Sequence, residues 1–213
     1  FYLTPIAIIS NSVRFAVMTT GIALLVGTSA AYFLSKSSSR ISWFQDAFYM
    51  MPLGVSAVVM GLGYLLAFNR PPVDLRGSWL ILIIAHSLIA YPFVIRSVLP
   101  ALRAVPTQLQ ESAAVLGASP TKTFIYIYLP ILTPGLIVGA TFAFAVSMGE
   151  FGASLLLVRP EFTTMPVAIF RLLGQPGSSN FGQALAMSSL LMMIVAAGFI
   201  AIERLRYRNS GGF

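Results

Sequence analysis

The chain has no cysteine and one histidine, His86, among its 213 residues. Without cysteine there are no disulfides, thiolate metal sites or cysteine nucleophiles, and a lone histidine leaves a histidine-based metal cluster without a second ligand of its kind. Charge is also scarce, because 9% of the residues are charged, against roughly 25% in a typical soluble domain. The composition argues against a soluble domain and excludes thiol and zinc chemistry.

A phosphate-binding loop is missing as well. The G-x-x-x-x-G-K-[ST] pattern needs a glycine before its lysine, whereas Lys36 follows Ser35 and Lys122 follows Thr121. We therefore expect no ATPase site, no cofactor bound by this chain and no enzymatic activity of its own. Paired carboxylates and a histidine relay, which proton-coupled carriers tend to place in their spans, are absent from the apolar runs. Their absence weakens the alternative of an ion-coupled carrier or channel, which stays open.

Long uncharged apolar runs are what the sequence has instead. Hydrophobic residues make up 57% of the chain and its mean hydropathy is +0.86, and a bilayer core of about 30 Å needs about 20 helical residues. The runs predict a single all-α domain, a polytopic membrane bundle with spans at about 15–34, 47–68, 79–95, 124–149 and 184–202. Residues 1–12 are expected to be too short to cross, and a first residue other than methionine suggests a cut or processed start.

The distribution of Lys and Arg predicts which loops face the cytoplasm. A net charge of +7 would raise the question of nucleic acid in a soluble protein, but membrane proteins concentrate these residues in cytoplasmic loops, so we expect no nucleic-acid partner. With five spans, one side holds Lys36, Arg40, Arg96, Arg103, Lys122, Arg204, Arg206 and Arg208, and the other holds Arg14, Arg70, Arg76, Arg159 and Arg171. The larger group predicts a cytoplasmic location for loops 35–46 and 96–123 and for the C-terminus.

The predicted external loop, residues 151–183, is long for an unstructured connection. Its apolar run Phe151–Val158 is too short to cross and fits an interfacial or re-entrant segment. A short helix is expected at Met165–Leu173, followed by a stretch rich in Gly, Pro and Ser.

The cytoplasmic loop at 103–123 has the signals of a helix, a turn and a second helix. Thr107 and Gln110 have the spacing of a capping box, which would start the first helix. Gly117 is placed to end that helix with a positive φ. Ser119 followed by Pro120 is typical of a helix start.

The first of these helices has a small apolar face. Leu109, Ala113 and Leu116 recur at helical spacing, and together they bury little surface on their own. A hairpin at the membrane surface with such a stripe and one acid, Glu111, is suited to being held by a partner protein.

Residues of the same loop resemble a known family signature. Glu111, Ser112 and Ala113, then Gly117 after three residues and Ile127-Tyr128-Leu129-Pro130 after nine more, match the E-A-A-x3-G-x9-I-x-L-P signature of binding-protein-dependent ABC importer permeases. Ser112 stands where the signature has alanine. The order of three spans, this loop and two further spans also resembles the five-helix core of that family.

The resemblance implies a transport subunit in the cytoplasmic (inner) membrane of a prokaryote, surrounded by membrane lipid. Its ATPase-coupling residues would be Glu111, Ser112, Ala113, Leu116, Gly117, Ser119 and Pro120. The implied partners are a cytosolic ABC ATPase dimer that binds ATP and Mg, an extracytoplasmic solute-binding protein and a second permease half. That half is an identical chain, a different subunit or a fused part of a longer protein, and the start at Phe1 favours the fused case.

Four residues are candidates for the substrate pathway or outer gate. Glu150 ends the fourth predicted span, and a carboxylate near membrane depth is costly unless it faces water, protein or a partner. A gate role and a structural role, in which Glu150 accepts hydrogen bonds from backbone amides of its glycine-flanked turn, are equally open. Phe151 follows it directly. His86 and Tyr91 are candidate substrate contacts, although hydrogen-bonded packing is favoured for both.

Segments around Glu150 also resemble particular branches of the family. Gly149-Glu150-Phe151-Gly152 and the later Thr164-Met165-Pro166 resemble permeases for thiamine, ferric iron, sulfate and molybdate. Residues 172–177 and 180–184 resemble the thiamine and iron(III) branch most. The resemblance implies thiamine or iron(III) as substrate, with sulfate, molybdate or a polyamine less favoured.

A G-x-x-x-G pattern lies in the fourth predicted span. Gly135 and Gly139 are about one helical turn apart, and Ala143 extends the row of small residues. Small residues let two membrane helices approach closely, so we expect another span to pack against this face.

Overall fold

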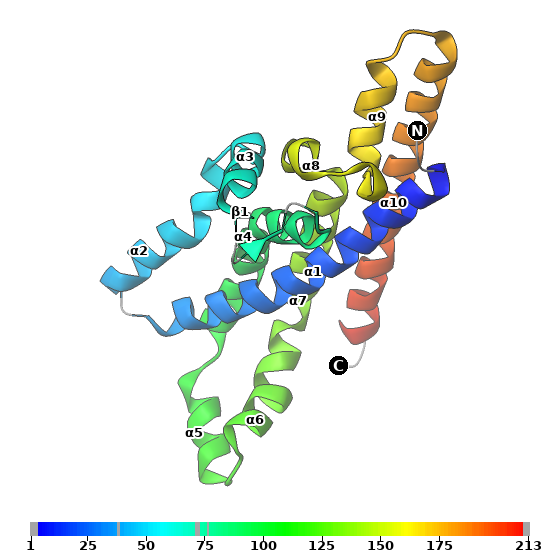
Figure 1. The fold of residues 1–213 in the computed structure, drawn as a ribbon. Helices are drawn as coiled ribbons and strands as arrows, with labels where there is room; N and C mark the ends of the chain where they lie inside the picture. Colours follow the sequence, from blue (N-terminus) through cyan, green and yellow to red (C-terminus); the bar gives the residue numbers. More distant parts are fainter. Residues whose placement is uncertain (1–3, 38, 71–72, 76, 211–213) are drawn as a thin grey trace.

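A computed structural model describes residues 4–37, 39–70, 73–75 and 77–210, most of them helical (Figure 1). Arg76, counted above among the external charges, lies outside the described residues. The helical elements are α1 (Pro5–Lys36), α2 (Ser39–Met50), η1 (Met51–Gly54), α3 (Ala57–Ala67), α4 (Leu80–Ala104), α5 (Thr107–Val115), α6 (Pro120–Thr123), η2 (Phe124–Tyr128), α7 (Leu129–Gly149), α8 (Gly152–Leu157), η3 (Pro160–Phe162), α9 (Met165–Leu173) and α10 (Ser178–Ser210). A short antiparallel ladder joins β1 (Asn69–Arg70) and β2 (Val73–Asp74). The predicted all-α class is confirmed.

The first span is longer than predicted. α1 begins at Pro5, so residues 5–14 belong to the span instead of preceding it. Thr4 caps the helix by accepting a hydrogen bond from the Ala7 N–H at 3.4 Å, and proline suits the first turn because its missing N–H would be unpaired there anyway. With 32 residues at 1.5 Å each, α1 is about 48 Å long. It exceeds the roughly 30 Å hydrocarbon core and is therefore expected to tilt.

The second predicted span is broken. Its two parts, Trp43–Gly54 and Ala57–Ala67, are bent by 97°. Pro52 has no N–H to donate to the preceding turn, and Val55 and Ser56 are extended, with ψ of 137° and 131°. These residues end the first part and allow α3 to start in a new direction.

The other three spans also exceed the predicted windows. α4 continues to Ala104, the stretch formed by α6, η2 and α7 begins at Pro120, and α10 begins at Ser178. Windows chosen for the absence of charge stop early because these helices continue into polar and charged sequence. Arg96 and Arg103 consequently lie inside α4 and not in a loop.

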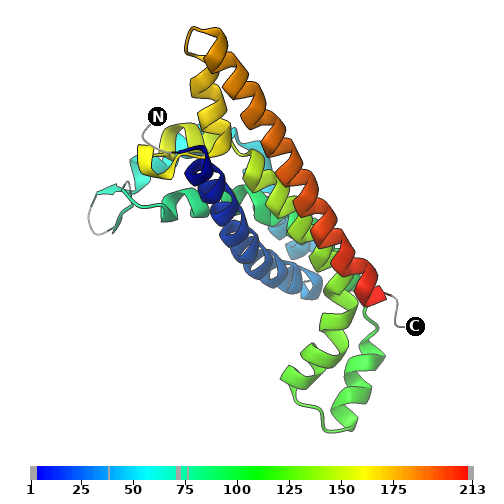
Figure 2. The same cartoon turned by 90° about the vertical axis from the view of Figure 1, so that its right-hand side faces the viewer.

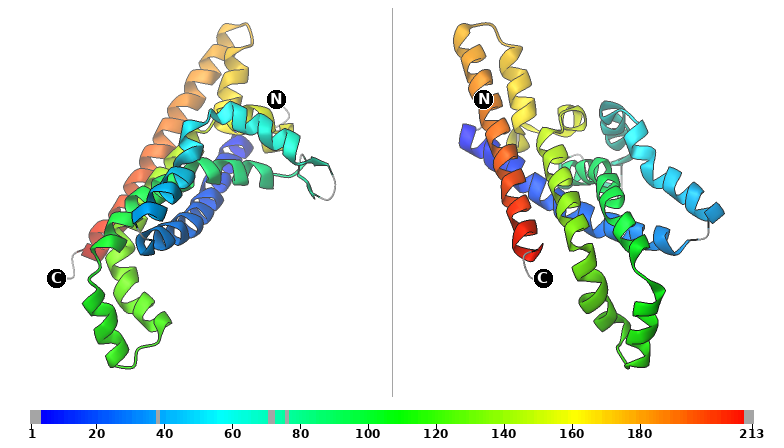
Figure 3. Two further views of the ribbon diagram at one scale, coloured as in Figure 1. Left: turned by 90° about the vertical axis from the view of Figure 1, so that its left-hand side faces the viewer. Right: turned by 180° about the vertical axis from the view of Figure 1, so that it is seen from behind.

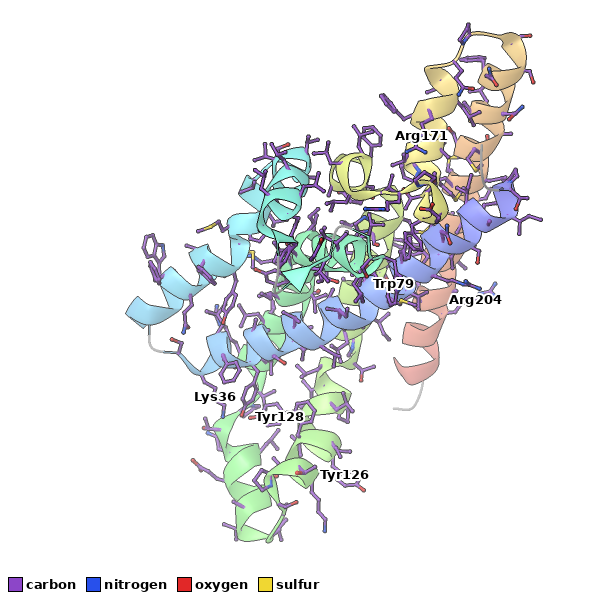
Figure 4. The ribbon with its side chains drawn as sticks, viewed as in Figure 1. Lys36, Trp79, Tyr126, Tyr128, Arg171 and Arg204 are labelled. Atoms are coloured by element: carbon purple, nitrogen blue, oxygen red, sulfur yellow. The ribbon has the colours of Figure 1, made fainter. Side chains whose placement is uncertain are left out.

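Two apolar clusters give the direction of α1, the broken pair, α4 and α7. One joins the ends of α1 and α4 to the start of α7, through Leu34, Leu102 and Tyr128. The other joins the first half of α1, the end of α3, the start of α4 and the segment after α7, through Phe15, Phe68, Ile81 and Ala153. The broken pair therefore leads from the first cluster to the second. Among the described residues, four helices are long and apolar enough to cross a membrane, and the broken pair is a fifth if its two parts form one span. We call the end of the bundle at the first cluster the inner end and the end at the second cluster the outer end, following the charge distribution. In Figure 4, Lys36 and Tyr128 mark the inner end and Arg171 marks the outer end.

Close contacts place α4 at the centre of the bundle, between α1 and α7. A Cβ on Gly135 would lie 2.6 Å from the Ser97 carbonyl oxygen, and a Cβ on Gly139 would lie 2.9 Å from Ser97 Oγ. On the other side, a Cβ on Gly27 would lie 2.7 Å from the Cβ of Val94. None of these approaches leaves room for a side chain, so glycine is required for α1 and α7 to meet α4.

Each end of the bundle carries a projection. The hairpin of α5 and α6 extends from the inner end, and α9 with the first turns of α10 extends from the opposite end (Figures 1 and 2). The predicted short helix at Met165–Leu173 is α9, with the same bounds. The predicted interfacial segment contains the short helix α8.

Candidate coupling hairpin and outer turn

The coupling hairpin, residues 107–123, starts directly after α4. Pro106 precedes its first helical residue, Thr107, and no side chain caps the first amides of α5. The predicted capping box is therefore wrong, because Thr107 lies inside the first turn and a cap residue must precede it. Pro106 takes the extended conformation of a cap residue, with φ of −65°, which its ring favours.

A glycine turn ends α5. Gly117 has φ of +73°, as the sequence predicts, in a region that costs little only for glycine. Its N–H donates to the Ala114 carbonyl oxygen at 3.0 Å, and the Ala118 N–H donates to that of Ala113 at 2.9 Å. The two bonds form a Schellman motif, which satisfies carbonyls at the end of the helix and fixes the direction in which the chain leaves α5.

Ser119 starts the returning helix. Its hydroxyl accepts a hydrogen bond from the Lys122 N–H at 3.4 Å, and Pro120 occupies the first turn. After α6 the chain passes through the π turn η2 into α7. The hairpin is thus connected to α4 on one side and to α7 on the other.

Aliphatic side chains at the tip of the hairpin are open to solvent. Val115 is 87% and Leu116 is 85% exposed, whereas Ala113 is 7% exposed. The predicted stripe of Leu109, Ala113 and Leu116 is therefore not one continuous face, because Ala113 is covered and Leu116 is not. Val115 was missed in the sequence because it falls outside that helical series.

The exposed pair lines a shallow pocket of about 530 Å³ with Gln108, Glu111 and Ser112. Two residues of the family signature thus share a surface with the aliphatic pair. Contiguous exposed apolar surface with a polar rim is typical of a protein interaction site. Gly117, Ser119 and Pro120 do not line the pocket; they shape the turn that presents it.

At the outer end, Glu150 lies one residue beyond α7. Its Oε1 accepts a hydrogen bond from the Ala153 N–H at 2.9 Å, so the carboxylate caps α8. Burial raises the pKa of the Glu150 carboxyl above its ordinary value, and hydrogen bonds from the N–H groups of Ala153 and Gly152 lower it in part. Of the two roles that the sequence leaves open, this arrangement corresponds to the structural one, in which Glu150 accepts hydrogen bonds from backbone amides of its turn. The gate role stays a prediction.

His86 joins three helices next to this turn. The residue is 1% exposed, with Nδ1 2.9 Å from Ser147 Oγ on α7 and Nε2 2.8 Å from Ser154 Oγ on α8. Ser147 precedes Glu150 and Ser154 follows it, so the ring connects both sides of the outer turn to α4. A neutral imidazole donates through one nitrogen and accepts through the other, which leaves neither nitrogen free for substrate in this conformation.

The side chains of Tyr91 and Phe151 contact other elements. The Tyr91 hydroxyl donates to the Tyr49 carbonyl oxygen at 2.9 Å and ties α4 to the first part of the broken span. The ring of Phe151 contacts that of Phe170 on α9, with centroids 5.1 Å apart. Of the four predicted pathway residues, the structure therefore places Glu150, Phe151 and His86 at the outer turn, and Tyr91 against the first part of the broken span.

One contact of two charged residues was not expected. Arg96 Nη2 on α4 lies 3.0 Å from Asp46 Oδ2 on α2, and both residues lie in segments that count as spans. We expected both residues in cytoplasmic loops, Asp46 at the end of 35–46 and Arg96 at the start of 96–123. Both are helical, because α2 and α4 extend beyond the charge-free windows. Their position relative to the membrane stays a prediction.

Comparisons with known proteins agree with this fold. Residues 23–208 match the family described as binding-protein-dependent transport system inner membrane component. The putative 2-aminoethylphosphonate transport system permease protein PhnV of Salmonella paratyphi A is 31% identical over 187 residues, which cover 87% of this chain and 69% of that protein. The molybdenum transport system permease protein ModB of Escherichia coli K12 is 30% identical over 165 residues, which cover 71% of this chain and 72% of that protein. The chain belongs to this family of ABC importer permeases and is a multi-pass inner-membrane protein.

Solved structures share the architecture. The crystal structure of a bacterial alginate ABC transporter, in complex with a periplasmic protein bound to an alginate pentasaccharide, has a TM-score of 0.72 at 19% identity and covers 95% of this chain and 78% of that chain. A second bacterial ABC transporter, involved in alginate import, has a TM-score of 0.69 at 17% identity, covering 93% and 78%. The permease fold implied by the resemblance is confirmed.

The substrate implied by the resemblance has less support. PhnV and ModB are named for 2-aminoethylphosphonate and molybdenum, and neither is named for thiamine or iron. The comparisons thus establish the class of transport subunit and leave its substrate to be proposed.

Proposed function

We propose that this chain forms one half of an ABC importer pathway and that its coupling hairpin is seated in a cytosolic ABC ATPase dimer, which binds ATP and Mg. The observation that carries the proposal is the exposed pair Val115 and Leu116 on a hairpin whose turn is fixed by Gly117. Fully burying a Val or Leu side chain contributes about 1.5–3 kcal/mol, so covering this pair can anchor a partner protein.

The hairpin is connected so that its displacement reaches the centre of the bundle. α5 follows α4 through Val105 and Pro106, and α6 continues through η2 into α7. α4 and α7 are in close contact at Gly135 and Gly139. Packed elements switch between discrete arrangements, so ATP-driven closure of the ATPase dimer would move α4 and α7 together between inward-facing and outward-facing states.

Two further partners complete the importer. A second permease half, identical, different or fused, supplies the other wall of the pathway. A solute-binding protein docks at the outer end and delivers the substrate near α8 and α9. The family description and the periplasmic protein of the alginate complex support this partner.

For the substrate we favour a small oxyanion, because PhnV is named for 2-aminoethylphosphonate and ModB for molybdenum. Thiamine, iron(III), sulfate and a polyamine, which the sequence resemblance implies, should be tested in the same uptake assay. Uptake of each labelled compound by proteoliposomes containing the importer and its binding protein distinguishes them.

Leu116→Asp tests the coupling role. A carboxylate in place of the aliphatic anchor is expected to lower recovery of the ATPase subunit with the purified permease about tenfold, which corresponds to about 1.4 kcal/mol. ATP-driven uptake should fall with it. The control is Leu173→Asp, a residue 54% exposed at the outer end, which should leave ATPase recovery unchanged. Equal recovery from both variants contradicts the coupling role, and uptake that follows an ion gradient without ATP favours the carrier interpretation.

A further inference from the structure

An arginine and an aspartate meet between two segments that are long and apolar enough to count as spans. Arg96 lies in α4, about two helical turns before its inner end, and Asp46 lies in α2, the first part of the broken span. Their side chains are 3.0 Å apart, from Arg96 Nη2 to Asp46 Oδ2. Charged residues within spans are costly, and they mark substrate paths or similar functional sites by default. Neither the coupling hairpin nor the outer turn uses this pair.

The pair is open on one side. The Arg96 side chain is 57% exposed and that of Asp46 is 31% exposed. Asp46 Oδ1 is buried and has no hydrogen-bond partner among the described residues. Against lipid, this exposed guanidinium would face hydrocarbon, which is unfavourable. A water-filled pathway satisfies the exposed guanidinium of Arg96.

Arg96 belongs to a stripe on the open face of α4. Residues three and four apart share a helix face, which places Phe93, Arg96, Pro100 and Arg103 in one row, the last three of them exposed. The ring of Phe93 stacks on that of Phe142 of α7, with centroids 6.0 Å apart. Seen from behind (Figure 3, right), α4 lies between α2 and α7, and α1 crosses on its far side. The row therefore descends between two spans toward the coupling hairpin.

We propose that Arg96 is an anion subsite on the wall of the pathway and that Asp46 occupies its guanidinium when no anion is present. The subsite rests on the proposed function, in which the chain is a pathway half for a small oxyanion. A guanidinium offers five N–H donors in a planar fork that matches oxyanions such as phosphonate. A passing anion replaces the Asp46 carboxylate at Arg96, and the carboxylate displaces it again.

Arg96→Gln is the main test. In proteoliposomes containing the whole importer, uptake of labelled molybdate and 2-aminoethylphosphonate is measured together with the ATP hydrolysis that the loaded binding protein stimulates. Arg96→Gln is expected to lower uptake of the transported anion about tenfold while stimulated hydrolysis stays within about twofold, since one charge-assisted hydrogen bond supports a change of that size. Uptake by Arg96→Lys should lie between that of wild type and that of Arg96→Gln, because an ammonium attracts an anion but lacks the planar fork of donors.

The matched control is Arg14→Gln, which removes the same charge from an exposed position on α1. It should leave both uptake and hydrolysis unchanged. An unchanged uptake in Arg96→Gln overturns the subsite.

Asp46→Asn separates the subsite from an ion pair that only holds α2 against α4. For a subsite, removal of the competing carboxylate leaves uptake within about twofold of wild type while Arg96→Gln loses it, since only the arginine contacts the anion. Equal losses in the two variants, with equally reduced recovery of assembled importer, overturn the subsite in favour of the structural pair.

The wild-type measurement tests the proposed function on its own. ATP-driven uptake of thiamine or iron(III) and of neither anion overturns the substrate class and this subsite with it. The absence of any ATP-driven uptake overturns the importer role itself. Normal wild-type uptake of either anion with normal uptake by Arg96→Gln overturns the subsite alone.

Discussion

The two ends of this bundle differ in whether the chain satisfies its own side chains there. At the inner end, the coupling hairpin leaves the side chains of Val115 and Leu116 exposed. At the outer end, the turn around Glu150 is closed by the chain itself, through the cap to Ala153 and the buried His86. The inner end therefore needs another protein to cover it, whereas the outer end is held by internal hydrogen bonds that must rearrange if the turn moves.

The largest expected effect comes from breaking the geometry of the hairpin. Gly117→Pro forces φ near −65° where the chain has +73°, so the Schellman motif is lost and the exposed pair is redirected. ATP-driven uptake in proteoliposomes is expected to fall more than tenfold at normal membrane insertion, which corresponds to more than about 1.4 kcal/mol of coupling. Gly117→Asn is the control, because asparagine tolerates the left-handed conformation. Equal losses in both variants would show that backbone geometry is not the cause.

An intermediate effect is expected at the outer turn. His86→Leu leaves the buried hydroxyls of Ser147 and Ser154 without their partner, and an unsatisfied buried group costs about 1–3 kcal/mol. We expect a lower unfolding temperature in detergent with unchanged recovery of the ATPase subunit, because the hairpin is untouched. His86→Gln, which can still donate and accept, should recover part of the loss. A variant His86→Leu as stable as wild type would contradict the role of this histidine in holding the turn.

The smallest effect is a pH dependence at Glu150. Because burial raises the pKa of this carboxyl from its ordinary 4.5, the folded protein holds the proton at a higher pH than the unfolded chain does. Its contribution to stability is fully present below 4.5 and is lost as the pH rises through the raised value. Glu150→Gln should flatten this part of the curve of unfolding temperature against pH. Identical curves for the variant and wild type would contradict the shift.

Features set by neighbouring residues could be predicted from the sequence. The left-handed Gly117, the Ser119 cap and the helix at Met165–Leu173 depend on residues within a few positions of one another. The segments that qualify as spans also follow from local apolar length. The start of α5 was misjudged because two local signals compete there, and Pro106 takes the cap position that Thr107 was expected to hold.

Contacts between distant segments could not be predicted in the same way. His86 meets its two serines across 61 and 68 residues, and Arg96 meets Asp46 across 50 residues. Nothing in the sequence near these residues specifies the partner, because the pairing follows from how the spans pack. Apolar length does not give the bend of the second span, because it measures whether a segment can cross and not whether it crosses straight.

That bend bears on the order in which the protein is assembled. Neither part of the broken span, 43–54 or 57–67, has the roughly 20 residues needed to cross on its own. The support for α3 comes from α8, where a Cβ on Gly61 would lie 3.0 Å from Ala153 Cα and one on Gly152 would lie 3.1 Å from the Val58 nitrogen. During synthesis from the N-terminus, α8 leaves the ribosome long after α3. The second crossing is therefore expected to mature late, once the fourth crossing has delivered the segment against which it rests.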